Sequence, residues 1–181
     1  MPTPIPTIET ERLILREPQA KDFAPFAEFY ASDRAKFVGG PLTAEGSWRM
    51  LAMEIGHWSL KGFGRWIVED RATGKAVGLV GLFEPEGWPE PEIGWDLFNG
   101  YEGQGFATEA ALAARGYAYD VLGWTTAISL VKPGNDASAA VAERMGAKPD
   151  GMVTHERHGA MHVWRHPAPV ELSDGGMEAY A

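Results

Sequence analysis

The stretch Asn99-Gly-Tyr-Glu-Gly-Gln-Gly-Phe-Ala-Thr-Glu-Ala110 decides the fold of this chain. It follows an alternating apolar run over 92–98, which predicts a strand, and leads into a helical pattern over 106–122. Its three glycines allow the backbone to turn sharply and to approach a ligand closely. Because the first turn of a helix has free N–H groups and a partial positive charge, such a junction can bind phosphate without a basic side chain. The stretch therefore predicts a nucleotide or coenzyme site.

A glycine loop by itself is compatible with several structures. It can be a simple tight connection between a strand and a helix. A dinucleotide-binding fold would need an acidic residue about 20 residues further on, at the end of the next strand. The corresponding region, 124–131, contains no acidic residue, and no Lys follows the glycines as it would in a P-loop. The surrounding sequence separates these alternatives.

Several further stretches follow one another in a recognisable order. They are Glu11-Arg-Leu-Ile-Leu-Arg16, Glu92-Ile-Gly-Trp-Asp-Leu-Phe98, Gly103-Gln-Gly-Phe-Ala-Thr-Glu-Ala110, Asn135-Asp-Ala-Ser138 and Glu143-Arg-Met-Gly-Ala147. Together they resemble the GCN5-related N-acetyltransferase (GNAT) superfamily, and within it the branch that acetylates the N-termini of ribosomal proteins. The resemblance covers about residues 8–167. It implies an α/β fold with a mixed central sheet of about seven strands, splayed between the fourth and the fifth, and about four flanking helices.

The length of 181 residues predicts one domain, over 1–167, followed by a flexible C-terminal tail over 168–181. The chain has no Cys, so disulfides, a thiol nucleophile and cysteine metal ligands are excluded, and no metal is expected. No apolar run reaches the length of a membrane span, and the first residues lack a signal-peptide pattern. These features predict a cytoplasmic enzyme without a membrane partner.

The formal net charge is −9. Such a charge disfavours nucleic-acid binding, which depends on basic surface, and it suits a cationic amine substrate. An anionic coenzyme must then be held locally by backbone amides and a helix terminus. The oligomeric state stays open, with a homodimer as one option.

Hydrophobic periodicity predicts strands and helices in mixed order. Strands are expected over 12–17, 65–70, 75–84, 92–98, 124–131, 152–156 and 161–166, and helices over 20–32, 43–61, 106–122 and 137–145. Residues 1–10 are expected to be a loose lead-in, and the alternation over 12–17 indicates an edge or second-layer strand. On the helix over 43–61 one face carries Trp48, Leu51, Ile55 and Trp58, most of which are expected in the core.

The resemblance implies a set of coenzyme contacts. Acetyl-CoA, as co-substrate, would place its pyrophosphate on the backbone amides of Gly103, Gln104, Gly105, Phe106, Ala107 and Thr108. Its pantetheine arm would pair with the backbone of Leu97, Phe98 and Asn99 at the splay, and the family's Asn-x-x-Ser corresponds to Asn135 and Ser138 near the thiol. Asn135 also fits a helix cap after Pro133-Gly134, and both roles can hold together.

The chain departs from the family pattern at two positions. The motif commonly begins with Gln or Arg, but this chain has Glu102, which is expected to point into solvent because a carboxylate would repel a diphosphate. Many relatives carry a Tyr at the position of Ala142, so the general acid is left open. Ser138 is the candidate that protonates the departing thiolate or donates a hydrogen bond to it.

The candidate general base is Glu92, acting on the amine through water. Glu92 and Asp96 share one strand face, and Glu84, Glu86 and Glu90 precede them. This acidic set is either a solvated sheet edge or a negative mouth that attracts an ammonium group. His155 and His158, which flank the last hairpin turn, are weaker alternatives for the base.

The sequence thus predicts an N-acetyltransferase that moves the acetyl group of acetyl-CoA to a primary amine by direct attack, since no Cys or Ser nucleophile is recognisable. The acceptor is a protein N-terminal α-amine or a small-molecule amine, because neutralising a lysine at pH 7 costs roughly 4.6 kcal/mol and an α-amine roughly 1 kcal/mol. The alternative is a noncatalytic acyl-CoA-binding or regulatory module on the same fold. A nucleotide-dependent enzyme would require regularly alternating strands and helices, which the pattern lacks.

Overall fold

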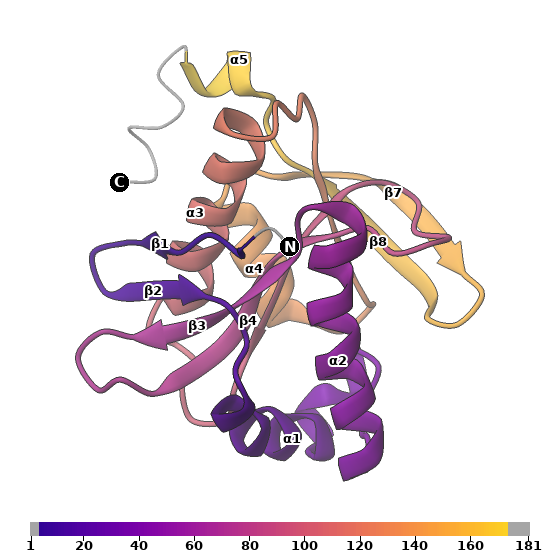
Figure 1. Cartoon of the computed structure of the whole chain (residues 1–181). Coiled ribbons are helices and arrows are strands. Elements are labelled where there is room, and N and C mark those ends of the chain that lie inside the picture. Colours follow the sequence, from indigo (N-terminus) through magenta and orange to yellow (C-terminus); the bar gives the residue numbers. More distant parts are fainter. Residues whose placement is uncertain (1–3, 174–181) are drawn as a thin grey trace.

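An eight-stranded mixed sheet forms the centre of the molecule, and helices cover both of its faces (Figure 1). The computed structural model describes residues 4–173. The strands are β1 (Ile8–Glu9), β2 (Leu13–Arg16), β3 (Arg65–Asp70), β4 (Ala76–Phe83), β5 (Glu92–Leu97), β6 (Ile128–Val131), β7 (Lys148–His155) and β8 (Gly159–Arg165). The helices are α1 (Phe23–Ala31), α2 (Ala44–Lys61), α3 (Phe106–Asp120), α4 (Asp136–Arg144) and the short α5 (Pro169–Glu171), with 3₁₀ turns η1 (Ala20–Asp22) and η2 (Asp33–Phe37).

The strand order is β1-β2-β3-β4-β5-β6-β8-β7, and only the β5–β6 pair is parallel. β5 and β6 are paired through one residue couple, Glu92 with Ile128. In a regular parallel ladder the Leu130 N–H would next donate to the Ile93 carbonyl. Here the Ser129 hydroxyl donates to that carbonyl (2.6 Å), and the Glu92 carboxylate accepts from Leu130 N–H (3.0 Å). Two side chains replace a rung, and the strands splay, as the sequence predicted.

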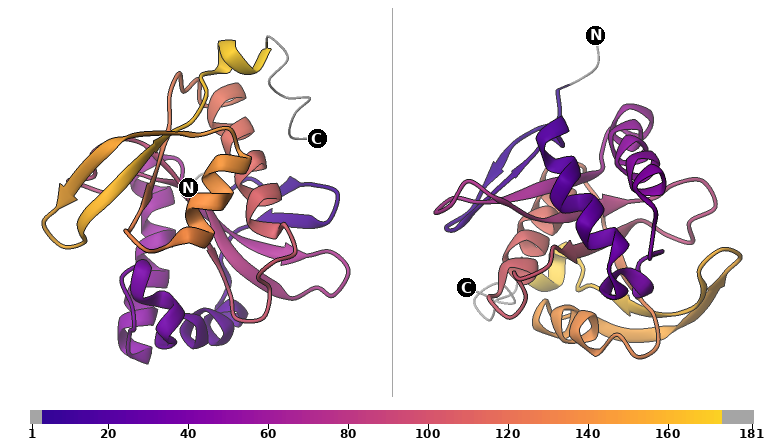
Figure 2. Two further views of the ribbon diagram at one scale, coloured as in Figure 1. Left: turned by 180° about the vertical axis from the view of Figure 1, so that it is seen from behind. Right: turned by 90° about the horizontal axis from the view of Figure 1, so that it is seen from below.

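Alternation along the central strands buries both faces of the sheet. On one face Val80 and Leu82 pack against the alanines of α3, whose small side chains allow close approach. On the other face Leu79 packs with Phe26 and Tyr30 of α1. Figure 2 shows α1 and α2 on one side of the sheet and α3 on the other. β4 is therefore buried on both sides, as predicted for 77–83.

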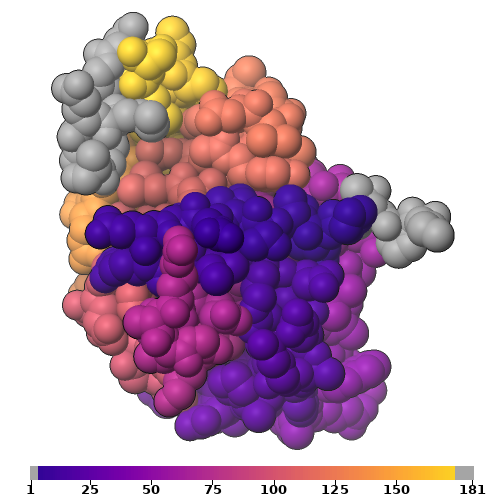
Figure 3. Space-filling model, turned by 60° about the vertical axis from the view of Figure 1, so that its left-hand side comes forward, coloured from indigo at the N-terminus to yellow at the C-terminus, as the bar shows by residue number. Residues whose placement is uncertain are grey.

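The N-terminal segment is more ordered than predicted. β1 pairs with β2 through Ile8 and Leu15, so β2 is internal to the sheet and β1 is the edge. The prediction of a loose lead-in was wrong because two paired residues give no periodic signal. Figure 3 shows this segment, in indigo, lying across the surface beside α3.

Strands β6 and β7 begin at residues that differ from the predicted ones. β6 begins only at Ile128, because Trp124 instead packs its ring against Phe63 (5.1 Å between centroids) and donates its backbone N–H to α3. β7 begins at Lys148, before its predicted start. α5 lies in the segment predicted as a flexible tail, and the rest of that prediction, 174–181, lies outside the described residues.

The buried face of α2 was predicted in part. Leu51 and Trp58 are buried, whereas Trp48 and Ile55 are 62% and 43% exposed. The buried face of α2 also contains polar residues, above all the fully buried Glu54. A prediction based only on the positions of apolar residues therefore assigned Trp48 and Ile55 to the buried face incorrectly. The predicted cap is present, because the Thr43 hydroxyl accepts from Gly46 N–H (3.0 Å).

Candidate active site

The open side of β5 presents free backbone groups to the splay. Phe98 N–H donates to Val77 of β4 (2.8 Å), whereas the carbonyl of Ile93 faces β6. Because backbone groups alternate along a strand, those of Trp95 and Leu97 also point away from β4. Both residues line cavities at this edge.

The three predicted pantetheine residues are not equivalent. Leu97 N–H points into the splay, while its carbonyl accepts from Arg34 (3.0 Å). Both backbone groups of Phe98 are bonded within the protein, N–H to Val77 and carbonyl from Tyr101 N–H (3.3 Å), and its ring is buried. The side-chain oxygen of Asn99 accepts from Arg34 (2.9 Å).

The glycine loop has the backbone shape that the sequence predicted. Gly103 and Gly105 have φ values of +74° and +79°, a left-handed conformation that favours glycine, and Gly105 is the N-cap of α3. Within residues 4–173 no group accepts a hydrogen bond from the N–H of residues 103–105. The first-turn N–H groups of α3, at Phe106, Ala107 and Thr108, have no partner inside the helix. Six neighbouring donors thus gather at one corner.

Glu102 is exposed, with 44% of its side chain accessible to solvent as predicted, but its carboxylate is also bound within the protein. One carboxylate oxygen accepts from Gly100 N–H (2.8 Å), and the other pairs with Nε of Arg34 (2.7 Å). Arg34 belongs to η2, far away in sequence, so the pairing could not be read from the loop itself. Its guanidinium neutralises the carboxylate beside the glycine corner.

A second arginine supports the loop from behind. Arg12 Nη1 donates to the carbonyl of Gln104 (2.7 Å), and Arg12 Nε pairs with Glu109 (2.6 Å). The guanidinium also lies over the ring of Phe106, 4.8 Å from its centroid. With its carbonyl fixed toward Arg12, the Gln104 peptide is held in one orientation.

Two cavities meet where β5 and β6 part. The larger, of about 1160 Å³, is lined by the glycine loop, the first turns of α3, and Arg144 of α4. The smaller, of about 390 Å³, is lined by β5, β6 and the β7–β8 turn. Trp95, Asp96, Asn135 and Ser138 line both. We call them the loop cavity and the fork cavity.

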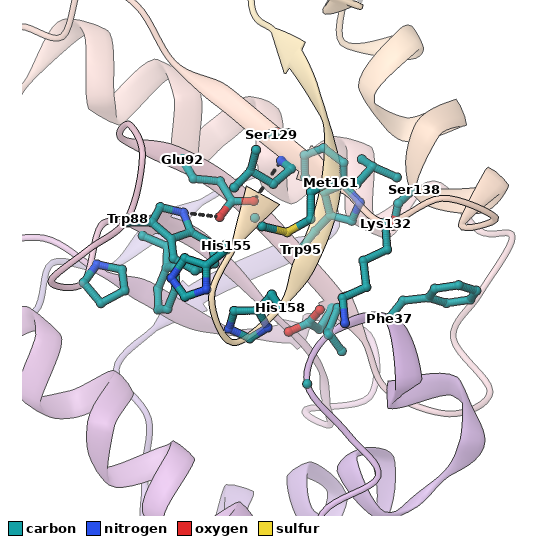
Figure 4. Close-up of a pocket in the computed structure, with 18 of the residues that line it drawn as sticks. Phe37, Trp88, Glu92, Trp95, Ser129, Lys132, Ser138, His155, His158 and Met161 are labelled. Carbon is teal, nitrogen blue, oxygen red and sulfur yellow. Dashed lines mark hydrogen bonds between the residues drawn. The ribbon is translucent and has the colours of Figure 1, made fainter. Parts of the chain in front are cut away.

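Glu92 is a buried acid that lines the fork cavity (Figure 4). Its carboxylate accepts from Trp88 Nε1 (2.8 Å) and from Leu130 N–H (3.0 Å), and the residue is 8% exposed. Burial raises the pKa of Glu92 to about 7, and the two hydrogen bonds offset only part of this effect. The carboxylate therefore exchanges protons near neutral pH, which suits a general base.

The other acids near Glu92 are mostly neutralised. Asp96 is buried and accepts from Tyr30 (2.7 Å) and Arg65 (2.9 Å), and Arg65 is also paired with Glu54. Elsewhere in the set, Glu90 pairs with Arg165 (2.8 Å) and Glu84 with Lys61 (3.8 Å). Three carboxylates of the acidic set, those of Asp96, Glu90 and Glu84, thus have cationic partners from other elements, whereas Glu86 forms no ion pair within residues 4–173.

Asn135 caps α4, as expected, by accepting from Ser138 N–H (3.3 Å). The cap places Ser138 in the first turn of α4, where it lines both cavities. Ala142 is fully buried one turn further on and brings no hydroxyl. His155 and His158 lie on the opposite wall, with ring centroids 5.0 Å apart, and burial lowers the pKa of His158.

Among the residues of this site that sequence reasoning missed are Arg34, Arg65, Trp88 and Leu130. Trp88 stands four residues before Glu92, and this spacing was the one local signal available. The others come from distant segments and act through a guanidinium or a backbone N–H. Within residues 4–173 no group of three or more His, Asp or Glu side chains could hold a metal. In the same range no helix has both the length and the apolar character needed to cross a bilayer.

Comparison with known proteins identifies the family. The model of the acetyltransferase (GNAT) domain matches residues 12–148, so the chain belongs to the GNAT family of acetyltransferases. The crystal structure of an acetyltransferase from Agrobacterium tumefaciens str. C58 is 37% identical, with a TM-score of 0.83 over 91% of this chain and 96% of that one. The mixed sheet splayed at its fourth and fifth long strands is thus the GNAT fold that the sequence predicted, with β1 as an added edge strand.

Two further relatives extend this picture. YkkB of Bacillus subtilis (strain 168), an uncharacterized protein, is 37% identical over 90 residues, 48% of this chain and 52% of YkkB, so the match spans about half of that protein. The ribosomal-protein-S5-alanine acetyltransferase of Vibrio fischeri is 16% identical with a TM-score of 0.71, over 92% of this chain and 99% of that one. At this identity the likeness concerns the fold.

Proposed function

We propose that this protein transfers the acetyl group of acetyl-CoA to a primary amine by direct attack. The observation that carries the proposal is Glu92, a buried carboxylate with a pKa of about 7 that lines the fork cavity, on the strand whose Trp95 and Asp96 line both cavities. An acyl donor in one cavity and an amine in the other would come together beside a proton acceptor. Holding two reactants in this way can lower a barrier by several kcal/mol.

The loop cavity fits the coenzyme. Amides of Gly103, Gln104, Gly105, Phe106, Ala107 and Thr108 would hold the pyrophosphate at the positive end of α3. Arg144, whose Nη1 lies 3.4 Å from the Thr108 hydroxyl, adds a cation at the same corner. Glu102 does not oppose this, because Arg34 neutralises it. The backbone N–H and carbonyl of Trp95 and the N–H of Leu97 would form hydrogen bonds with the pantetheine arm. Asn99 and Asn135 would lie beside the arm, and the buried Phe98 would hold the strand end in the core.

Glu92 acts first in the proposed reaction. Its carboxylate takes a proton from the ammonium group, directly or through water, and the freed nitrogen attacks the thioester carbonyl carbon. An N–H of β5 that points into the splay would stabilise charge on the carbonyl oxygen. The carbon–sulfur bond then breaks, and the second proton of the attacking nitrogen passes to the departing thiolate, so that the amide and the free thiol of CoA are formed. Ser138 would donate a hydrogen bond to the departing thiolate. With a thiol pKa of about 8.5, the thiolate needs little further help.

The acceptor that this base can serve is weakly basic. A carboxylate with a pKa near 7 is poorly matched to a lysine amine, which costs roughly 4.6 kcal/mol to neutralise at pH 7, against roughly 1 kcal/mol for an α-amine. A protein N-terminal α-amine or a small-molecule amine is therefore the favoured acceptor. The fold shared with a ribosomal-protein acetyltransferase is consistent with the first of these.

Thiol release tests the proposal. Purified protein with acetyl-CoA is offered N-terminal peptides, amino acids, polyamines and aminoglycosides, and acetylated product is identified by mass spectrometry. Release that depends on an amine, with a matching mass increase, is expected. Release at the same rate without an amine would contradict acetyl transfer to nitrogen.

The alternative, a noncatalytic acyl-CoA-binding module, draws support from Ala142, which has no hydroxyl where many relatives have one. Calorimetry with acetyl-CoA distinguishes the two when combined with the acceptor screen. Tight binding of acetyl-CoA with no turnover of any amine, in a protein whose Glu92→Gln variant behaves identically, would favour the module.

A further inference from the structure

Two cations line the fork cavity without an acidic partner. Lys132 follows β6, and Arg157 lies in the turn between β7 and β8. Neither forms an ion pair with any residue in the described range 4–173. The chain has 25 acidic against 16 basic residues, so partners are plentiful elsewhere on the surface. Glu86, which also lines the cavity, likewise forms no ion pair in this range, so unpaired charges of both signs face the cavity.

These two charges act at the same place. Burial lowers the pKa of His158, and the charges of His155, Lys132 and Arg157 lower it further. In Figure 4 the Lys132 side chain extends along one wall toward His158 and Phe37, while Glu92 lies at the other end. The cavity therefore holds the Glu92 carboxylate at one end and the Lys132 ammonium group near His158, and Glu86 and Arg157 also line it.

The remaining arginine of the cavity is already satisfied. Arg65 pairs with Glu54 and with Asp96 (2.9 Å), and its guanidinium lies 4.9 Å from the centroid of the Phe83 ring. An anion would have to displace a buried carboxylate to reach it, which is costly. Arg65 consequently contributes to the framework, and Lys132 and Arg157 are left for a ligand.

The coenzyme does not account for these charges. Arg34 and Arg144 line the loop cavity, where the phosphates of the coenzyme would lie. Lys132 and Arg157 line only the fork cavity. Their position matches a ligand group on the acceptor side of the splay.

We propose that the acceptor carries an anionic group, a carboxylate or a phosphate, in addition to its amine, and that Lys132 and Arg157 bind this group. The inference rests on the proposed function, since it assumes that the fork cavity receives the amine. The ammonium group faces Glu92 and the anion faces the two cations, so the charges orient the acceptor along the cavity. Charge-assisted hydrogen bonds to carboxylate or phosphate are the strong ones in proteins.

Matched ligand pairs test the charge preference. Free ω-amino acids from glycine to 6-aminohexanoate are compared with their carboxamides, and phosphoethanolamine with ethanolamine. Tripeptides with Asp or Glu at position 2 or 3 are compared with their Asn or Gln counterparts, which separates a peptide source from a small molecule. Binding to the CoA-saturated protein is measured by calorimetry, and turnover by thiol release. At least one anionic member should bind about tenfold more tightly than its neutral partner.

Charge-removing variants locate the effect. Lys132→Met, Arg157→Gln and the double variant should lose the preference for the anionic member and leave affinity for the neutral one unchanged. Lys75→Met is the matched control, because Lys75 is an exposed lysine in the β3–β4 turn, remote from both cavities. Equal binding of every charged and neutral pair, or a preference that survives in the double variant, would overturn the inference. Charge-selective binding that is lost in the double variant, without acetyl transfer to any amine, would contradict the proposed function and the identification of the ligand as acceptor, while the anion site at Lys132 and Arg157 would stand.

Discussion

Glu92 combines two roles that follow from one position. Glu92 is the residue of β5 that pairs with β6, opposite Ile128. In a continued ladder the Leu130 N–H would donate to the backbone of β5, but here it donates to the Glu92 carboxylate. The carboxylate is therefore buried at the branch point of the strands, and burial raises its pKa to about 7. The feature that opens the splay also tunes the proposed base.

The first prediction concerns pH. Because Glu92 must be ionised to accept a proton, kcat/KM should rise with pH through about 7 and level off above it. Glu92→Gln should lower kcat by about 10²–10⁴-fold and remove this step from the pH profile. Rates are measured between pH 5.5 and 9 with two acceptors of different amine pKa.

The control is Glu90→Gln, which removes an acid of the same loop that pairs with Arg165 outside the two cavities. It should keep the full profile. A step near pH 7 that persists in Glu92→Gln, or that moves with the amine pKa of the acceptor, would assign the titration to another group.

The second prediction concerns the polar network behind the splay. The Ser129 hydroxyl donates to Ile93, so His166 Nε2, 2.8 Å away, must carry the proton and donate to Ser129. Nδ1 of His166 then accepts from Arg115 (3.4 Å). Burial lowers the pKa of His166 to about 3, with Arg115 and Arg165 adding to the effect. The ring is neutral in the folded protein.

A depressed histidine pKa makes folding sensitive to acid. Below pH 6.5, His166 is protonated in the unfolded chain but stays neutral in the folded protein. The free energy of unfolding therefore falls as the pH is lowered, until the pH reaches about 3. Between pH 6.5 and 4 this contribution amounts to about 3 kcal/mol. His166→Gln should remove that extra loss, as measured by urea unfolding at several pH values. The exposed His162→Gln on β8 should not, and equal acid sensitivity of both variants would refute the assignment.

At the level of elements, the β5–α3 junction is held from three sides. Arg12 fixes the Gln104 carbonyl, Glu102 binds Gly100 N–H, and Arg34 holds Glu102. The loop amides are thereby held in place before a ligand arrives, which reduces the ordering cost of binding. A helix terminus with fixed donors is a better anion site than a mobile loop.

The third prediction separates charge from backbone strain. Gly105→Glu places a carboxylate at the predicted pyrophosphate corner and should weaken CoA binding on the order of 100-fold. Gly74→Glu is the matched control, because Gly74 also has a positive φ (+69°, against +79° for Gly105) and lies in the remote β3–β4 turn. Both variants carry similar left-handed strain, but a Cβ at position 105 would also lie 3.2 Å from Arg12 Nη2, whereas a Cβ at position 74 would have no neighbour within 4 Å. Calorimetric titration with CoA is the measurement, and equal affinities would show that the corner is wrongly assigned.

The elements that sequence predicted well are those with local signals. The glycine loop, the Thr43 and Asn135 caps and the buried strand over 77–83 are each specified by neighbouring residues. The failures involve partners from distant segments. The pairing of Glu102 with Arg34 joins the loop to η2, and it would explain why an acid is tolerated beside the proposed phosphate site. The buried Glu54 of α2 is acceptable only because Arg65 of β3 meets it, and no periodicity in α2 reveals this.

The whole molecule consists of two sheet halves with one parallel contact between them. β1–β5 form one half and β6, β8 and β7 the other, and the halves are joined by the Glu92–Ile128 pair and two side-chain hydrogen bonds. The loop cavity is lined from both sides of this division, by β5 and α3 on one side and α4 on the other. A ligand there would connect parts of the protein that few backbone bonds connect.

The fourth prediction follows from this arrangement. CoA at about 100 times its dissociation constant should stabilise the folded state by about 2.7 kcal/mol, which for a chain of this size raises Tm by about 5–10 °C. Because the ligand spans both halves, hydrogen exchange of amides in β6 and α4 should slow as much as exchange in α3. Gly105→Glu, measured alongside, should show neither effect at the same CoA concentration. A rise in Tm with protection confined to α3 would mean that the coenzyme is held by one half alone, and that the splay does not guide its arm toward Glu92.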